Sequence, residues 1–155
     1  MSRALILILA IAAGAAQAQP QVNAHDAAAV EVLQPWSRPA EAGTTGAGYM
    51  VLANHGAAPA ILVRVDSPWA RRVEIHRSEM AGGIMRMMAE RQVKTPAGGQ
   101  VKFAPGGYHL MFVDLARALK PGDRLPATLS FAGGRRLKVE FRVGAGAGPP
   151  NGRNS

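Results

Sequence analysis

The chain has 155 residues, a formal net charge of +8, 48% hydrophobic residues and no cysteine. This length fits one ordinary domain with a buried core, and the missing thiols exclude disulfide bonds, a lipid-modified cysteine and a cysteine-ligated blue-copper centre. Basic residues are spread without a long run and no nucleic-acid motif accompanies them, so we expect a solvated basic surface, with an acidic protein partner or an anionic membrane face as the alternative.

The N-terminal segment has the pattern of a secretory signal. Arg3 is followed by the apolar run 4–16 and then by Ala16-Gln17-Ala18, which has the small-x-small pattern of a cleavage site. The run is shorter than the ~20 apolar residues that a membrane-spanning helix needs. We therefore expect residues 1–18 to be a signal peptide cleaved after Ala18, and the mature protein to be exported without a membrane span. An uncleaved tether is the alternative.

Short segments rich in β-branched and aromatic residues follow, separated about every ten residues by glycine and proline turns. The candidate strands are residues 28–33, 48–53, 59–65, 72–77, 84–92, 100–103, 109–113, 124–131 and 137–143. This recurrence predicts an all-β domain over residues 28–143, built as an antiparallel sandwich or barrel. We expect one short helical turn at 114–119, and a flexible tail at 144–155, where apolar periodicity ends.

Two histidines and two methionines follow the spacing H-x10-M-x21-H-x-M: His76, Met87, His109 and Met111. Thioether sulfur is a soft, uncharged ligand that prefers Cu(I), and neutral imidazole suits copper in either common oxidation state. These four side chains therefore predict a Cu(I) site.

Strand geometry indicates how the four ligands meet. Side chains alternate faces along a strand, so His109 and Met111 point the same way. Gly82-Gly83 is a preferred two-residue hairpin loop, and with that loop His76 lies opposite Ala89 and shares a face with Met87. A one-residue slip would put His76 and Met87 on opposite faces.

The other methionines of this region are expected to have different roles. Met80 and Met85 fall on the face of His76 near the hairpin tip, where we favour packing or partner contact over an auxiliary ligand role. Met88 falls on the opposite face, where we expect core packing. Outside the pattern, His25 follows the cleavage region, and His55 occupies a turn where a solvated surface role is expected.

At the four ligands the chain resembles the periplasmic PCuAC copper chaperones of bacteria, whose signature is this spacing. The resemblance covers residues 30–143 and includes several further segments: Trp36-Ser37-Arg38-Pro39, Gly46-Ala47-Gly48-Tyr49, Val73-Glu74-Ile75-His76, Gly82-Gly83-Ile84-Met85-Arg86-Met87 and Pro105-Gly106-Gly107-Tyr108-His109-Leu110-Met111. It implies a cupredoxin-like, Greek-key β-sandwich or barrel in the periplasm, with Cu(I) held by the four ligands. Some members carry a histidine-rich C-terminal extension, but residues 144–155 contain neither histidine nor methionine.

The resemblance also implies that copper is handed to an acceptor, typically the dinuclear copper centre of cytochrome c oxidase. The partner would then be cytochrome c oxidase subunit II or a thiol-disulfide protein that assembles this copper centre. We expect no enzyme, because a G-x-S-x-G elbow is missing and residues 43–48 do not match a nucleotide-binding loop. The alternative function is an exported β-sandwich for protein interaction, with a methionine-rich contact face and no metal role.

Overall fold

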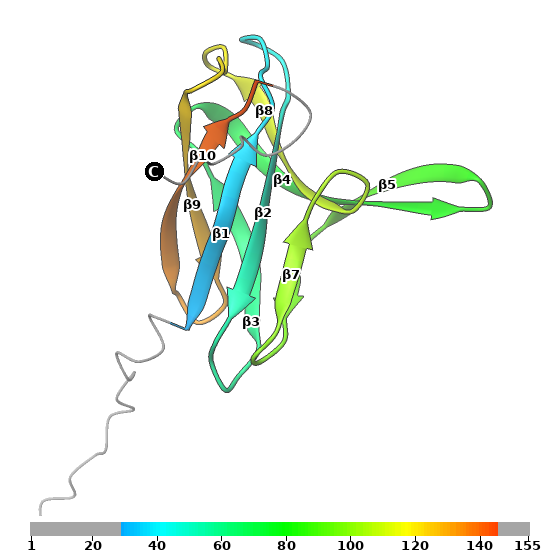
Figure 1. Ribbon diagram of the computed structural model, residues 1–155, viewed down its shortest axis with the longest axis vertical. Helices are drawn as coiled ribbons and strands as arrows, with labels where there is room; N and C mark the ends of the chain where they lie inside the picture. The colour runs from blue at the N-terminus through cyan, green and yellow to red at the C-terminus, as the bar shows by residue number, and fades with distance from the viewer. Residues whose placement is uncertain (1–28, 146–155) are drawn as a thin grey trace, which may run out of the picture.

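The computed structural model describes residues 29–145, which form ten β-strands (Figure 1). They are β1 (Val30–Ser37), β2 (Gly46–Asn54), β3 (Ala60–Asp66), β4 (Ala70–Ala81), β5 (Ile84–Glu90), β6 (Val93–Thr95), β7 (Gln100–Phe103), β8 (Tyr108–Leu115), β9 (Arg124–Phe131) and β10 (Arg136–Val143). Within this range no helix is long and apolar enough to cross a membrane. The predicted signal peptide, His25 and residues 146–155 of the predicted tail lie outside the described residues.

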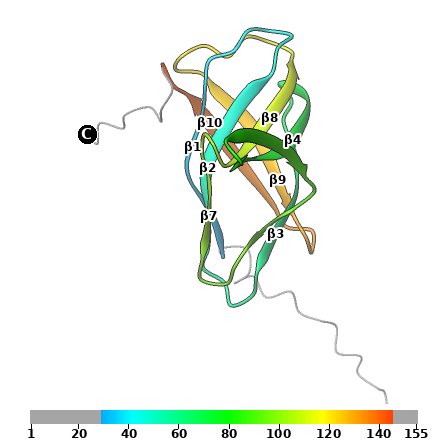
Figure 2. The same cartoon turned by 90° about the vertical axis from the view of Figure 1, so that its right-hand side faces the viewer.

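The ten strands form one sheet in the order β5-β4-β8-β7-β2-β1-β10-β9-β3-β6. Most neighbours are antiparallel, whereas β1 with β10 and β7 with β8 are parallel. The sheet curls so that β3 and β4 also approach each other, and the strands surround a common interior (Figure 2). The predicted all-β, cupredoxin-like sandwich or barrel is confirmed, with two parallel pairings added to its antiparallel plan.

The core results from period-two alternation of apolar side chains. Along β9 every second residue from Leu125 to Phe131 is buried, as expected for strands with one face on the core. Phe112 of β8 and Phe141 of β10 meet edge to face, with ring centroids 5.6 Å apart. Gly48 of β2 allows this approach, because a Cβ there would lie 2.6 Å from Phe112 Cε2. Each fully buried side chain of this size contributes about 1.5–3 kcal/mol.

Two local predictions need correction. The strand Val93–Thr95 was not predicted, because three residues are too short to show an alternating pattern. The helical turn expected at 114–119 is wrong, since Asp114 and Leu115 end β8 and Asp114 has a φ of 56°, outside the right-handed helical region. The Leu119 amide instead donates to the Ala40 carbonyl at 2.8 Å.

The hairpin of β4 and β5 projects from the rest of the molecule (Figure 1). Strand β4 is paired with β8 only as far as Arg77, which lies opposite Tyr108. Beyond that point its residues pair only with β5. We call residues 78–88 the hairpin arm and the remaining strands the body. Gly82 and Gly83, with φ of 59° and 78°, form the predicted two-residue loop.

Candidate metal centre

The four predicted ligands lie on one face of the three neighbouring strands β5, β4 and β8. His76 of β4 is directly opposite His109 of β8, and their ring centroids are 5.8 Å apart in an edge-on arrangement. Across the hairpin, His76 lies opposite Ala89 and Ser78 lies opposite Met87, which is the register predicted from the glycine loop. The two imidazoles, 33 positions apart in sequence, are therefore direct cross-strand neighbours.

His109 is 5% exposed and is held in one tautomer by the backbone. It lies between the core residue Leu110 and the loop that precedes β8, and its Nδ1 is 2.9 Å from the Gly107 carbonyl oxygen. A carbonyl only accepts hydrogen bonds, so Nδ1–H donates and the neutral ring keeps its lone pair on Nε2. The same carbonyl accepts the Ser78 amide at 3.0 Å, which attaches the base of the hairpin arm to this loop.

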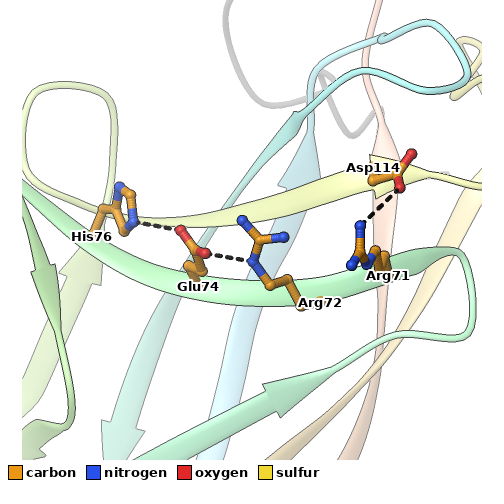
Figure 3. A network of polar contacts seen from close by, with 5 residues as sticks. All are labelled: Arg71, Arg72, Glu74, His76 and Asp114. Atoms are coloured by element: carbon orange, nitrogen blue, oxygen red, sulfur yellow. Dashed lines mark hydrogen bonds and ion pairs between the residues drawn. The ribbon is translucent and has the colours of Figure 1, made fainter.

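In His76 the lone pair is on Nδ1, whereas in His109 it is on Nε2. Its Nε2 is 3.0 Å from Glu74 Oε2, and because an ionised carboxylate only accepts, Nε2–H donates and Nδ1 keeps the lone pair (Figure 3). Nδ1 is buried and has no hydrogen-bond partner. A buried acceptor without a partner is costly, and a metal ion is one way to satisfy it. The pair thus offers two imidazole nitrogens, each oriented by a hydrogen bond at the opposite ring nitrogen, as is usual for metal-bound histidines.

Glu74 is a residue of the site that the sequence reasoning missed. It lies between His76 and Arg72 along β4, and it accepts a hydrogen bond from Arg72 Nε at 2.6 Å (Figure 3). The hydrogen bond from Arg72, followed by that from His76, lowers the pKa of the Glu74 carboxyl below its usual value. The available signal was the two-residue spacing of Glu74 and His76, which puts both side chains on one face of a strand.

The two methionines flank the histidine pair at opposite corners. Met111 of β8 is half-buried and lies opposite Glu74 on one side and Ala47 of β2 on the other. Met87, in the hairpin arm, is 56% exposed. In an untwisted ladder, with about 3.3 Å per residue and about 4.8 Å between strands, the Met87 and Met111 backbones would be roughly 16 Å apart. The histidines and Met111 therefore form the compact part of the set, and Met87 is its outlying member.

One expectation for the remaining methionines is wrong. Met88 does not pack in the core, because it belongs to the projecting arm and is 38% exposed. Met80 and Met85 lie on the face of His76, opposite each other, as predicted. Both are exposed, so packing within the chain does not explain them, and the expected partner contact stays a prediction. His55 is a surface residue as predicted and lies 3.0 Å from Glu31.

The donors gathered here are soft and mostly neutral. Within residues 29–145 no three or more histidine, cysteine, aspartate or glutamate side chains form a group that could hold a metal ion. Any ion at this face would therefore depend on thioethers for its additional ligands. The thioethers decide the preference, because they suit a soft monovalent cation and are poor ligands for Zn²⁺ or Ca²⁺.

A curled all-β body with a His/Met face is what the resemblance to the PCuAC chaperones predicted. The family model described as "Putative lipoprotein LpqE-like" matches residues 30–143. The chain belongs to this LpqE-like/PCuAC family. It is 31% identical over 127 residues to "Putative lipoprotein Lxx21020" of Leifsonia xyli subsp. xyli, covering 81% of this chain and 76% of that protein.

Solved structures show the same architecture. The copper-bound PCuAC domain from PmoF2 matches with a TM-score of 0.64 and 27% identity, covering 76% of this chain and 94% of that one. The solution structure of Cu(I)-DR1885 from Deinococcus radiodurans matches with a TM-score of 0.59 and 28% identity, covering 78% and 85% of the two chains. The resemblance predicted from the sequence is thereby confirmed at the level of family and fold.

Proposed function

We propose that this protein is an exported Cu(I) metallochaperone that binds copper through His76, Met87, His109 and Met111. The observation that carries the proposal is the facing histidine pair, in which one hydrogen bond per ring leaves Nδ1 of His76 and Nε2 of His109 free to bind an ion. Similarity to the copper-bound PCuAC domain and to Cu(I)-DR1885 supports the choice of ion.

The charge balance of the site suits a monovalent ion near the surface. Thioethers and neutral imidazoles add no charge, so bound Cu(I) leaves a positive site whose burial would be costly. Glu74, which is partly exposed, supplies a negative charge next to His76, and the exposed Met87 keeps one side of the site open. An open site lets the ligands of an acceptor replace the protein's ligands one at a time, so copper changes hands without release.

The acceptor that we propose is the dinuclear copper centre of cytochrome c oxidase, reached either directly on subunit II or through a thiol-disulfide assembly protein. Export by the predicted signal peptide, with cleavage after Ala18, would bring the mature protein to the periplasm, where that centre is assembled. Deletion of the gene is expected to lower oxidase activity at limiting copper and to leave it unchanged when copper is abundant. Normal oxidase activity at limiting copper would rule out this acceptor while leaving copper binding open.

The ligand set is tested by anaerobic Cu(I) titration against a chromophoric chelator, combined with X-ray absorption to count sulfur and nitrogen neighbours. We expect one tightly bound Cu(I) with both kinds of neighbour, and a large loss of affinity in the double variant His109→Ala/Met111→Ala. The control is His55→Ala, which removes an exposed surface histidine from outside the site. Unchanged Cu(I) affinity in the double variant would refute the site.

The alternative of a metal-free interaction module rests on the exposed methionines of the arm. The same double variant separates the two functions, because it leaves all the methionines of the arm in place. A chaperone loses copper binding with its fold intact. An interaction module would retain its partner affinity and would show no preference of the unmodified chain for Cu(I) over Zn(II).

A further inference from the structure

The hairpin arm concentrates exposed thioethers in a way that packing does not explain. Within residues 29–145, five of the seven exposed large hydrophobic side chains belong to the arm: Met80, Ile84, Met85, Met87 and Met88. Three of these are methionines on the face that carries His76: Met80, Met85 and Met87, with exposures of 64%, 59% and 56%. Exposed apolar groups on one face usually serve an interaction, and thioether sulfur adds the capacity to bind soft metal ions.

The register brings these three sulfurs within reach of one ion. Met80 and Met85 are directly opposite each other next to the Gly82-Gly83 loop, so their Cβ atoms are about 4.5–5.5 Å apart. Met87 follows Met85 by two residues and therefore lies on the same face. Methionine is unbranched, with three rotatable bonds, so its sulfur adjusts easily to a bound ion.

We propose that Met80, Met85 and Met87 form an outer site for a soft monovalent cation, Cu(I) or Ag(I). This inference builds on the proposed function, because Met87 is also a ligand of the inner site with His76 and His109. At about 3.3 Å per residue, the tip pair lies roughly 13 Å along β4 from His76, and Met87 lies between them. The outer site is an entry point: the ion binds first at the arm and then exchanges sulfur for imidazole ligands through Met87. Its oxidation state does not change.

The outer site can be measured once the inner site has lost two of its ligands, His109 and Met111. In the full chain carrying His109→Ala/Met111→Leu, labelled at the methionine methyl groups, we expect Ag(I) to shift the NMR signals of Met80, Met85 and Met87. The buried Met50 signal should not move. Adding Met80→Leu/Met85→Leu, which keeps side-chain volume, should raise the Kd for Ag(I) at least tenfold. The matched control, Met88→Leu on the opposite face of β5, should change it less than twofold.

Two outcomes overturn the outer site: Ag(I) shifts no signal of the Met80–Met85 pair, or the Met80→Leu/Met85→Leu change leaves Kd unaltered. The entry role is tested in the chain with an intact inner site, where the same double change should slow Cu(I) uptake from a chelator severalfold, and an unchanged rate overturns it. Failure of the proposed function gives a different result. If the inner site does not bind copper, the His109→Ala/Met111→Leu variant binds Cu(I) as tightly as the unmodified chain.

Discussion

The body and the hairpin arm use the same strand geometry for opposite purposes. In the body, alternate residues of β8 such as Leu110 and Phe112 are buried completely, and the strand has neighbours on both sides. In the arm, β5 pairs only with β4 within the described residues, and every residue from Ile84 to Met88 is exposed. The buried strands of the body keep the protein folded, whereas the exposed arm is free to contact an ion or a partner.

The candidate site lies where these two regions meet. The body supplies His109 and Met111, whose backbone is fixed by ladders on both sides of β8. The arm supplies Met87, which has no such support. A chaperone needs both properties, because the imidazoles must be positioned for binding while at least one ligand must be replaceable for release.

The largest effect concerns stability and contrasts the two regions directly. Phe112→Ala removes a fully buried ring that contacts Phe141, and we expect a loss of about 3–5 kcal/mol in the free energy of unfolding. Ile84→Ala in the arm should change it by less than about 0.5 kcal/mol, because that side chain is exposed. Urea denaturation of the metal-free protein measures both. A loss at Ile84 comparable to that at Phe112 would show that the arm is part of the cooperative core.

The second prediction applies the same contrast to copper. His109→Ala, in the body, should raise the Kd for Cu(I) about 100-fold or more, whereas Met87→Leu, in the arm, should raise it about tenfold. Removing a side chain that only orients a metal ligand typically lowers metal affinity about 10–100-fold. Removing a ligand that is itself held in position should lower the affinity at least as much. Competition titration with a Cu(I) chelator measures both values. Equal losses of Cu(I) affinity would mean that the arm holds its ligand as rigidly as the body does.

The sequence predicts the arm's internal register better than its surroundings. A two-residue loop at Gly82-Gly83 allows only one pairing, so the shared face of His76 and Met87 followed from local rules. The exposure of Met88 did not follow from local rules. It depends on where the pairing of β8 with β4 ends, which is at Tyr108, opposite Arg77. Alternation also identified most strands, but Val93–Thr95 exists only through its pairing with β3.

The sequence predicted the residues of the candidate site and only part of their arrangement. The H-x-M pattern put His109 and Met111 on one face by strand geometry alone. That His76 lies directly opposite His109 depends on a pairing between β4 and β8, whose residues are more than thirty positions apart. Glu74 was missed because a carboxylate two residues from a histidine is not by itself a distinctive pattern. The role of Glu74 becomes visible only in the structure, where it binds Nε2 of His76 and leaves Nδ1 buried without a partner.

The third prediction tests how tightly the body is packed behind the site. Gly48→Ala puts a Cβ 2.6 Å from Phe112 Cε2, and because that ring is fully buried, moving it would disturb its core neighbours, so we expect a loss of about 1–3 kcal/mol in unfolding free energy. Gly107→Ala is the control, because its Cβ would make an ordinary contact at 3.7 Å from the Ala104 carbonyl. Thermal denaturation compares the two. Equal stability of both variants would show that β2 and β8 can separate without cost.

The fourth prediction concerns the orientation of His76. Glu74→Ala removes the acceptor of its Nε2–H, and we expect the Kd for Cu(I) to rise about tenfold, since outer partners of metal-bound histidines typically contribute 10–100-fold. Glu74→Gln keeps an oxygen acceptor and should recover part of the loss. Glu31→Ala, which removes the partner of His55 instead, is the matched control. The same competition titration measures all three, and a Glu74→Ala value equal to the control would exclude a positioning role.

The smallest expected effect is a loss of stability at acid pH, which arises from an ion pair in the body. Arg64 donates hydrogen bonds to Asp66, and this lowers the pKa of the Asp66 carboxyl. Folding therefore favours the ionised form, so the stabilisation is fully present above the ordinary aspartate pKa of about 3.9 and is lost as the pH falls through the lower, folded-state value. Because the pair is exposed, we expect it to contribute less than about 1 kcal/mol. Asp66→Asn should therefore destabilise the protein slightly at pH 7 and by less at pH 2, as measured by urea denaturation. A difference of the same size at both pH values would mean that Asp66 acts through packing rather than charge, and the acid sensitivity of the body would then have to arise elsewhere.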